Sequence, residues 1–232
     1  MPMVSAIDSQ SGSKSEGGIA RRLILASRSP RRRQLLDDAG IAHTVQLAGE
    51  IDDGDLSPGS VSPENWVAAL AYLKARAVAE CLRGGTEHTF ASVVLGADTV
   101  CVQEGEIIGK PADRDMAERT IRLFSEAEHE VLTGVALVDD SQRIVDLFVD
   151  RARVRVGLIT DEQIATYLST ELWRDKAGAY NLFERIDAGW PIEYDGDGTT
   201  IVGLPMDALG KRFPSLGLAG PGSADQGPDH RA

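Results

Sequence analysis

The stretch Arg21–Gly40, RRLILASRSPRRRQLLDDAG, constrains the fold most, because it encodes a strand, a tight turn and a helix in succession. The run Leu23–Ala26 is apolar throughout, which is typical of a strand buried on both faces. Ser29 is placed to cap a helix, Pro30 occupies the first helical position, and Gly40 is placed to end that helix. The turn therefore combines hydroxyl groups with the free N-terminus of a helix.

Four cations surround this turn, and they suggest what it binds: Arg28, Arg31, Arg32 and Arg33. Positive side chains in a first helical turn oppose the helix dipole, at about 0.3–1 kcal/mol each where they are exposed. A bound anion would remove that penalty, and the helix N–H groups already point toward it. A solvated arginine face on an ordinary helix explains the residue types about equally well. The order of strand, hydroxyls and arginines favours a phosphate site that includes Ser27.

The overall charge limits the partners. The chain has 232 residues and a formal net charge of −12, which repels nucleic acids and anionic membrane surfaces. A local arginine cluster in such a chain suits a small polyanion. Cys81 and Cys101 lie in apolar patterns without metal-ligand spacing, and no apolar run approaches the ~18 residues of a membrane span. We expect a soluble, cytoplasmic protein that binds neither nucleic acid nor membranes.

The pattern of strands and helices predicts one α/β domain, in which a mixed central sheet is flanked by helices. Polar, aperiodic ends predict disordered tails at residues 1–20 and 217–232, around a folded domain at 21–216. Ala91–Val102 is expected to be the central strand, and residues 129–149 a hairpin. Residues 175–197 are expected to be mainly a glycine-rich loop. A helix opening at Ser62 and Pro63 is expected to face the core with one stripe of residues: Trp66, Leu70, Leu73, Ala77 and Cys81.

Asp98 is the strongest catalytic candidate, because it lies inside the apolar segment VVLGADTVCV. A carboxylate there is costly unless it is paired, hydrogen-bonded or bound to metal. Lys110 in GKP could reach a phosphate, and Asp52 and Asp53 offer further hard oxygen ligands, which suit Mg²⁺ together with phosphate. The plainer interpretation of Asp98 is a carboxylate that caps a neighbouring turn.

The two remaining lysines are weaker candidates. Lys74 lies beside the apolar stripe of its helix, where a lysine stem packing on apolar surface is the simpler explanation. Lys176 lies in the loop DKAGAY and by default is exposed. No Walker A, GxGxxG, HExxH or GxSxG motif is present, which removes the usual support for kinase, dehydrogenase, zinc-protease and α/β-hydrolase functions.

Seven blocks occur in an order that resembles the Maf family of nucleoside triphosphate pyrophosphatases: LILASRSPRRRQLL, LAYLKA, LGADTV, GEIIGKP, HEVLTGVAL, DKAGAY and VGLP. The resemblance runs from about Leu23 to Leu209. It implies an elongated, two-lobed α/β domain with a central cleft, similar to the inosine triphosphate pyrophosphatases. It also implies cleavage of a nucleoside triphosphate to monophosphate and pyrophosphate with Mg²⁺ or Mn²⁺, and a homodimer.

The resemblance assigns roles to particular residues. Asp98 corresponds to the catalytic acidic residue and is a metal ligand together with Asp52 and Asp53. The residues that correspond to substrate-binding positions are Ser27, Arg31, Arg32, Lys74, Thr99, Lys110, Lys176 and Phe183. This changes the interpretation of Lys74 from a surface lysine to a cleft lysine.

Two departures from the family pattern affect the details. The acidic loop has Asp52-Asp53 where the family usually has Asp-Glu, and Phe183 stands where members that prefer dTTP and UTP have glutamine. Arg31, Thr99 and the sequence KAGAY resemble the dTTP/UTP branch. We therefore expect hydrolysis of dTTP, UTP or modified pyrimidine nucleotides. The alternatives are a 7-methyl-GTP pyrophosphatase and a non-catalytic nucleotide-binding regulator of cell division.

Overall fold

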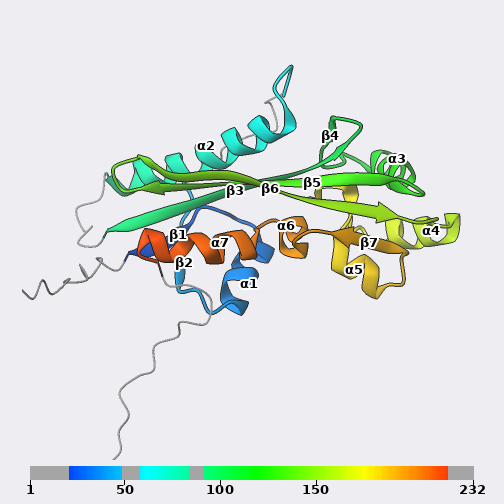
Figure 1. Cartoon of the computed structure of the whole chain (residues 1–232). Coiled ribbons are helices and arrows are strands. Elements are labelled where there is room, and N and C mark those ends of the chain that lie inside the picture. The colour runs from blue at the N-terminus through cyan, green and yellow to red at the C-terminus, as the bar shows by residue number, and fades with distance from the viewer. Residues whose placement is uncertain (1–20, 49–57, 84–90, 219–232) are drawn as a thin grey trace, which may run out of the picture.

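The computed structural model describes residues 21–48, 58–83 and 91–218, and these form an elongated mixed sheet with helices on both faces (Figure 1). The strand order is β2-β1-β3-β5-β6-β7, with β4 paired to β3. β1 is parallel to β2 and β3, and the other pairs are antiparallel, which confirms the predicted mixed sheet. The strands are β1 (Arg22–Leu25), β2 (His43–Val45), β3 (Ser92–Gln103), β4 (Glu106–Ile108), β5 (Glu128–Asp139), β6 (Ile144–Val156) and β7 (Ile192–Asp195).

The helices divide between the two faces of the sheet. The long helix α2 lies on one face, while α1, α6 and α7 lie on the other (Figure 1). No helix of the described ranges is long and apolar enough to span a bilayer. The helices are α1 (Pro30–Asp38), α2 (Pro63–Arg83), α3 (Arg114–Phe124), α4 (Asp161–Ser169), α5 (Leu182–Asp187), α6 (Gly198–Val202) and α7 (Met206–Arg212), with short 3-10 turns η1 (Ala177–Ala179) and η2 (Phe213–Leu216).

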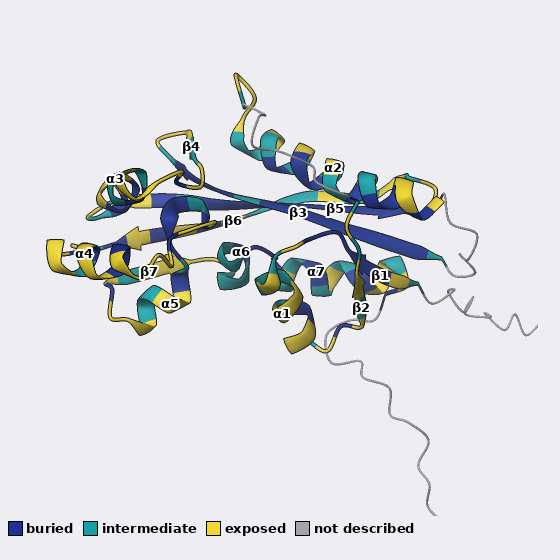
Figure 2. Ribbon diagram, turned by 180° about the vertical axis from the view of Figure 1, so that it is seen from behind, coloured by how far each residue is buried: buried dark blue, intermediate teal, exposed yellow. Residues whose placement is uncertain are grey.

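The face opposite α2 carries two separate apolar cores, one in each lobe. In one lobe, Leu95 and Ala97 of β3 pack with α1, α7 and the buried Leu218. In the other lobe, Cys101 of β3 and Val131 of β5 pack with α3, α4 and α5. Figure 2 shows the central strands β3 and β5 buried along most of their length and the outer helix surfaces exposed. The expected two-lobed shape therefore has a physical basis in two cores built on one continuous sheet.

The predicted buried stripe of α2 is wrong by about one residue. Leu73 and Cys81 are exposed, whereas the buried face consists of Val67, Leu70, Ala71, Ala75, Val78, Ala79 and Leu82. The cause lies in the strands beneath. A Cβ added at Gly96 or Gly134 would lie within 2.4 Å of a helix carbonyl oxygen, so the helix contacts the sheet backbone directly. At this distance alanine fits the contact face better than leucine, and helix periodicity alone does not reveal the glycine partners.

Residues 175–197 are not mainly loop, as the sequence analysis expected. They contain η1, α5 and β7, and the Asn181 side chain caps α5 by accepting from the Glu184 N–H at 3.2 Å. Each of these elements has at most six residues, too short for a periodic pattern. β7 forms by pairing with β6, which is a long-range contact that local sequence does not encode.

Candidate active site

The candidate site lies where the central strand β3 has an open edge. β1 pairs with β3 only as far as Leu25 opposite Leu95, and β4 pairs with it only from Cys101 onward. Residues 96–100 therefore have no strand partner on this side in the described part of the chain. A cavity of about 690 Å³ adjoins this gap, within the usual range for ligand sites.

The turn before α1 is held by hydroxyl caps. The Ser29 side chain accepts from the Arg32 N–H at 3.5 Å, and the Ser27 hydroxyl accepts from the Ser29 N–H at 3.2 Å. Pro30 occupies the first turn of α1, as predicted. The cap-then-proline pattern therefore fixes where the helix begins, at the edge of the cavity.

Arg32 crosslinks this turn to the rest of the site. Its Nη1 donates to the Ala97 carbonyl at 2.8 Å and to the Ser27 hydroxyl at 3.2 Å. Its Nε donates to the Gly203 carbonyl at 2.7 Å, and its Nη2 donates to the Thr99 hydroxyl at 3.1 Å. Arg32 thus satisfies one carbonyl of the open β3 edge and joins α1, β3 and the α6–α7 connection.

The other arginines of the turn differ from Arg32. Arg28 and Arg31 line the cavity, while Arg33 is exposed and lies outside the lining. Among the described residues Arg31 takes part in no ion pair, and the same holds for Lys110 across the cavity. The two side chains are therefore placed to meet an anion without first breaking a described salt bridge.

Asp98 is buried on the α2 face of β3 and pairs with Lys74. The Lys74 Nζ donates to the Asp98 Oδ1 at 2.6 Å, and the Asp98 residue is only 8% exposed. The close approach of α2 to the sheet brings the lysine into reach. Asp98 and Thr99 are consecutive strand residues, so their side chains point to opposite faces of the sheet. The open edge makes both faces accessible from one cavity, because both residues line it.

The loop that follows α4 supplies cations to the opposite wall, including Arg174 and Lys176. Lys176 Nζ donates to Glu184 Oε2 at 2.6 Å and is largely buried. The Gly178 N–H donates to the Gly109 carbonyl at 3.2 Å, so this loop is tied to the neighbour of Lys110. Two cation-bearing segments far apart in the sequence are therefore held side by side.

The same loop is fixed by unusual backbone conformations. Asp175 and Ala179 have φ values of 57° and 64°, in the left-handed region that side-chain-bearing residues rarely adopt. Gly178 has φ 67°, and a Cβ there would lie 2.6 Å from the Cys101 Sγ. The loop packs on the apolar core that contains Cys101 and Val131, and the Tyr167 hydroxyl donates to the Ala179 carbonyl at 3.0 Å. These contacts maintain its shape.

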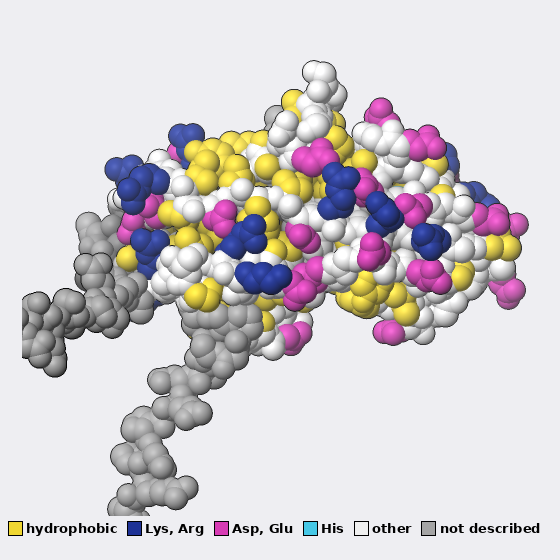
Figure 3. All heavy atoms as spheres, viewed as in Figure 1, with side chains coloured by type: hydrophobic (Ala, Val, Ile, Leu, Met, Phe, Trp, Pro, Cys, Tyr) yellow, Lys and Arg dark blue, Asp and Glu magenta, His cyan; other side chains and the backbone are white. Residues whose placement is uncertain are grey.

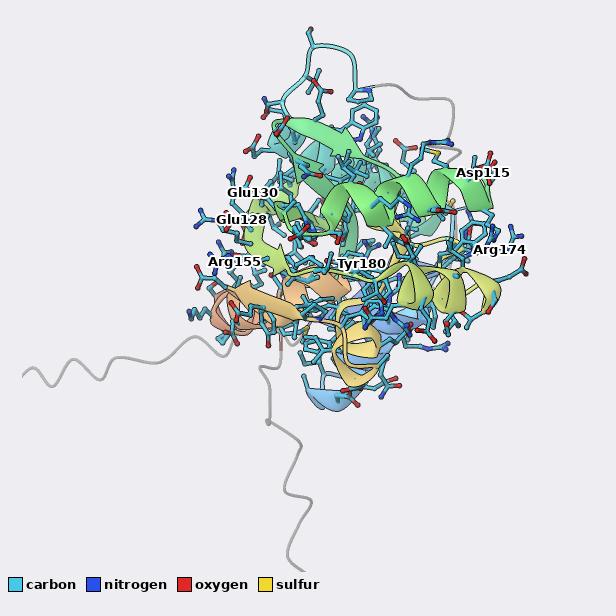
Figure 4. All side chains as sticks on the ribbon, turned by 90° about the vertical axis from the view of Figure 1, so that its right-hand side faces the viewer. Asp115, Glu128, Glu130, Arg155, Arg174 and Tyr180 are labelled. Atoms are coloured by element: carbon cyan, nitrogen blue, oxygen red, sulfur yellow. The ribbon has the colours of Figure 1, made fainter. Side chains whose placement is uncertain are left out.

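Tyr180 anchors the end of the loop below the cavity. Its hydroxyl lies 2.8 Å from the His129 Nε2, and the His129 ring stacks on Phe124 with centroids 3.9 Å apart. Burial lowers the pKa of His129 to about 4 and raises the pKa of Tyr180 well above its ordinary value. Both groups are therefore neutral near pH 7. Figure 4 shows Tyr180 in the interior and Arg174 toward the periphery.

The cavity concentrates positive charge in an acidic chain. Seven cations line it, against two carboxylates, Asp98 and Asp175, while the chain carries a net charge of −12. On the face seen in Figure 3, by contrast, basic and acidic side chains are mixed, and pairs such as Arg151–Glu130 and Arg153–Glu128 form on the surface. A cavity of one sign with low-dielectric walls attracts a polyanion of the opposite sign.

The structure gathers most, but not all, of the predicted site residues. Those that line the cavity are Ser27, Arg31, Arg32, Lys74, Asp98, Thr99, Lys110 and Lys176. Phe183 is not in the lining; it is 40% exposed and packs edge to face on Tyr194, with centroids 6.1 Å apart. Asp52 and Asp53 lie outside the described residues. The sequence did not single out Arg174 or Tyr180, although Tyr180 ends the KAGAY block that begins with Lys176, and Arg174 lies two residues before it.

The described residues provide a limited donor set for a divalent metal. They contain no group of three or more His, Cys, Asp or Glu side chains arranged as a metal site. Asp98 keeps Oδ2 without a partner among them, next to cations placed for phosphate. Mg²⁺ commonly binds through one or two carboxylates together with substrate phosphates and water, so this donor set fits an ion that arrives with its substrate.

The mixed α/β fold, the open strand edge and the cationic cavity beside a buried carboxylate are features suited to binding a small polyanion. The family model described as Maf-like protein matches residues 22–215, and the chain belongs to the Maf family.

Similar proteins extend this comparison. A protein named dTTP/UTP pyrophosphatase from Geobacillus sp. (strain WCH70) is 40% identical over 85% of this chain and 99% of its own. One of the same name from Geotalea uraniireducens (strain Rf4) is 41% identical over 79% and 89%. A solved dITP/XTP pyrophosphatase from Mycobacterium abscessus covers 60% of this chain and 75% of its own at 16% identity, with a TM-score of 0.33, too low to support an argument.

Proposed function

We propose that this chain hydrolyses a nucleoside triphosphate, dTTP or UTP in the first place, to the nucleoside monophosphate and pyrophosphate. One observation carries the proposal: a buried carboxylate, Asp98, shares a cavity with seven cations in a chain of strongly negative net charge. The relatives named dTTP/UTP pyrophosphatase, at 40–41% identity, support the choice of substrate.

Cations on both walls of the cavity hold the triphosphate. Arg31, through its side chain and its backbone N–H, contacts the phosphate chain from one wall, and Lys110 contacts it from the other. Arg28 and Arg174 add to the attractive field. As the bond between the α-phosphorus and the bridging oxygen breaks, negative charge grows on the departing pyrophosphate. Cations that already line the cavity stabilise this charge where it develops.

Asp98 is the proposed base. One oxygen is held by Lys74, which leaves Oδ2 to accept the proton of a water molecule as that water attacks the α-phosphorus. The water oxygen becomes part of the monophosphate, and pyrophosphate leaves with the electron pair of the broken bond. A divalent metal, Mg²⁺ or Mn²⁺, held by Asp98 with Asp52 and Asp53, would neutralise phosphate charge when bound.

Asp98→Asn tests the proposal. We expect the release of pyrophosphate to fall about 10³-fold, because general base catalysis contributes on the order of 10²–10⁴. Asp140→Asn, in the exposed turn between β5 and β6, is the matched control and should keep wild-type turnover. The measurement is pyrophosphate release from a panel of nucleoside triphosphates with Mg²⁺ or Mn²⁺. Wild-type turnover in the Asp98→Asn variant would remove Asp98 from the mechanism.

The same panel decides between the alternatives. Pyrophosphate release from 7-methyl-GTP but not from dTTP or UTP would make 7-methyl-GTP the substrate. Nucleotide binding without pyrophosphate release would favour a non-catalytic regulator. We further propose a cytoplasmic location, in keeping with a nucleotide substrate. A homodimer stays a prediction from the family resemblance, and light scattering of the full chain tests it.

A further inference from the structure

The seam between the two lobes is marked by a row of polar side chains. On the face opposite α2, Thr99 of β3 lies in register with Thr133 of β5, and Thr133 lies in register with Asp150 of β6. On β3, Ala97 belongs to one apolar core and Cys101 to the other, so the polar residue interrupts the apolar row between them. Thr133 is fully buried, yet it carries a hydroxyl.

The hydrogen bonds along this row have a defined direction. The Thr133 hydroxyl donates to the Thr200 carbonyl at 2.8 Å, which uses its only hydrogen. The contact of 2.8 Å between the Thr99 and Thr133 hydroxyls must therefore have Thr99 as the donor. The Thr200 hydroxyl donates in turn to the Asp150 carboxylate. Each buried polar group in the row is satisfied in a single arrangement.

This direction determines what Thr99 offers to Arg32. Because its hydrogen is committed to Thr133, the Thr99 hydroxyl presents a lone pair to Arg32, and the Arg32 Nη2 donates to it at 3.1 Å. Arg32 also holds the Ser27 hydroxyl and the Ala97 carbonyl at the open edge of β3. The row therefore extends from Asp150 on β6 across β5 and β3 to Arg32, which holds the turn before α1.

We propose that Thr133, Thr200 and Asp150 are positioning residues for the proposed hydrolysis, and that they act through Thr99 on Arg32. They fix the guanidinium, and with it the Ser27–Arg32 turn, at the distance from Asp98 that the reaction needs. This inference rests on the proposed function. It also assigns Thr99 to positioning, because its hydroxyl has no hydrogen left for a substrate.

The first test replaces the central hydroxyl. Thr133→Val keeps the shape of the side chain but leaves the Thr99 hydrogen and the Thr200 carbonyl without partners. We expect kcat for dTTP to fall about tenfold while KM stays within about twofold, because a misplaced turn costs the transition state more than the bound substrate. Thr133→Ser restores the hydroxyl and should recover kcat. Thr120→Val, at another buried threonine, on α3, is the matched control.

A double-mutant cycle separates positioning from loss of packing. If Thr133 acts through Thr99, the Thr99→Val/Thr133→Val variant has the kcat of the worse single variant. Multiplied defects would overturn the proposal, as would a wild-type kcat in Thr133→Val or a Thr133→Ser variant that is equally defective. Should Thr133→Val not fold, Asp150→Ala at the half-buried end of the row is expected to lower kcat about threefold, and an unchanged kcat there would overturn the proposal.

A structural readout makes the proposal independent of the reaction. In the wild type, the guanidinium NMR signals of Arg32 should show slow rotation, and in Thr133→Val and Asp150→Ala this rotation should accelerate. Equal rotation in wild type and variants would overturn the positioning role. A wild-type protein that releases no pyrophosphate from any nucleotide would instead overturn the proposed function, and the Arg32 signals would still decide this inference.

Discussion

The two walls of the cavity present cations in opposite ways. The turn before α1 uses regular local chemistry: two serine hydroxyls, a proline in the first helical turn, and an arginine that reaches back to β3. The loop after α4 uses left-handed residues, Asp175 and Ala179, which are held in place by burial on an aromatic core. The first wall is held by hydrogen bonds from its own side chains, whereas the shape of the second depends on its packing against the aromatic core.

This difference predicts which kind of substitution disrupts each wall. Removal of a hydrogen-bonding side chain should disrupt the first wall, since four Arg32 bonds join three elements there. Added volume or buried charge should disrupt the second wall, where Gly178 contacts Cys101 and His129 supports Tyr180. Three changes test this contrast.

The largest effect is expected from Arg32→Ala. It leaves the Ala97 and Gly203 carbonyls and the Thr99 hydroxyl without their donor. At about 1–3 kcal/mol for each unsatisfied buried group, and with partial access of water, we expect a loss of roughly 4 kcal/mol in the free energy of unfolding. Urea denaturation measures it. Arg33→Ala, on the same helix but exposed, is the control, and equal stability of the two variants would contradict the crosslinking role of Arg32.

Gly178→Ala should destabilise the second wall by about 3 kcal/mol. The methyl group meets the Cys101 Sγ at 2.6 Å, in a region already packed, and the backbone is left-handed. Gly189→Ala has a similar φ of 80° with open space around it, so it isolates the backbone cost of about 1 kcal/mol. Thermal unfolding of both variants measures the difference. If the two variants are equally stable, the close contact with Cys101 is not limiting.

Acid should loosen the second wall before the first. His129 has its pKa lowered to about 4 by burial, from an ordinary value of 6.5, so the unfolded chain gains its proton first as the pH falls. The stability that neutral His129 contributes is complete above about pH 6.5 and declines below it, by about 2 kcal/mol between pH 7 and pH 5. His129→Gln should flatten this part of the pH profile of unfolding. An unchanged slope would show that another group titrates there.

The sequence predicted the first wall well because its determinants are adjacent in the chain. Ser29, Pro30 and the apolar run before them specify the strand, turn and helix without help from elsewhere. The second wall was predicted only as a loop containing Lys176, because His129, which supports it, comes from β5, and Tyr167 reaches it only once α4 has packed against the loop.

The threonine row was not predicted for a related reason. Thr99, Thr133 and Asp150 become neighbours only through strand register, and register is a property of the folded sheet. The buried face of α2 was predicted about one residue out of place, because Gly96 and Gly134 decide which helix residues fit against the sheet. Local patterns thus predicted many of the residues that line the cavity, while contacts between distant segments decided the geometry of the cavity.

The contact between α2 and these two glycines has a consequence for how the site can vary among related chains. The separation of Lys74 from Asp98 depends on two absent methyl groups on β3 and β5, since either methyl would lift the helix away from the sheet. Selection that preserves the pairing of Lys74 with Asp98 therefore also acts on Gly96 and Gly134, two buried positions that lie under α2. A chain that acquired alanine at one of them would need a compensating change along α2 before its lysine could reach the carboxylate again.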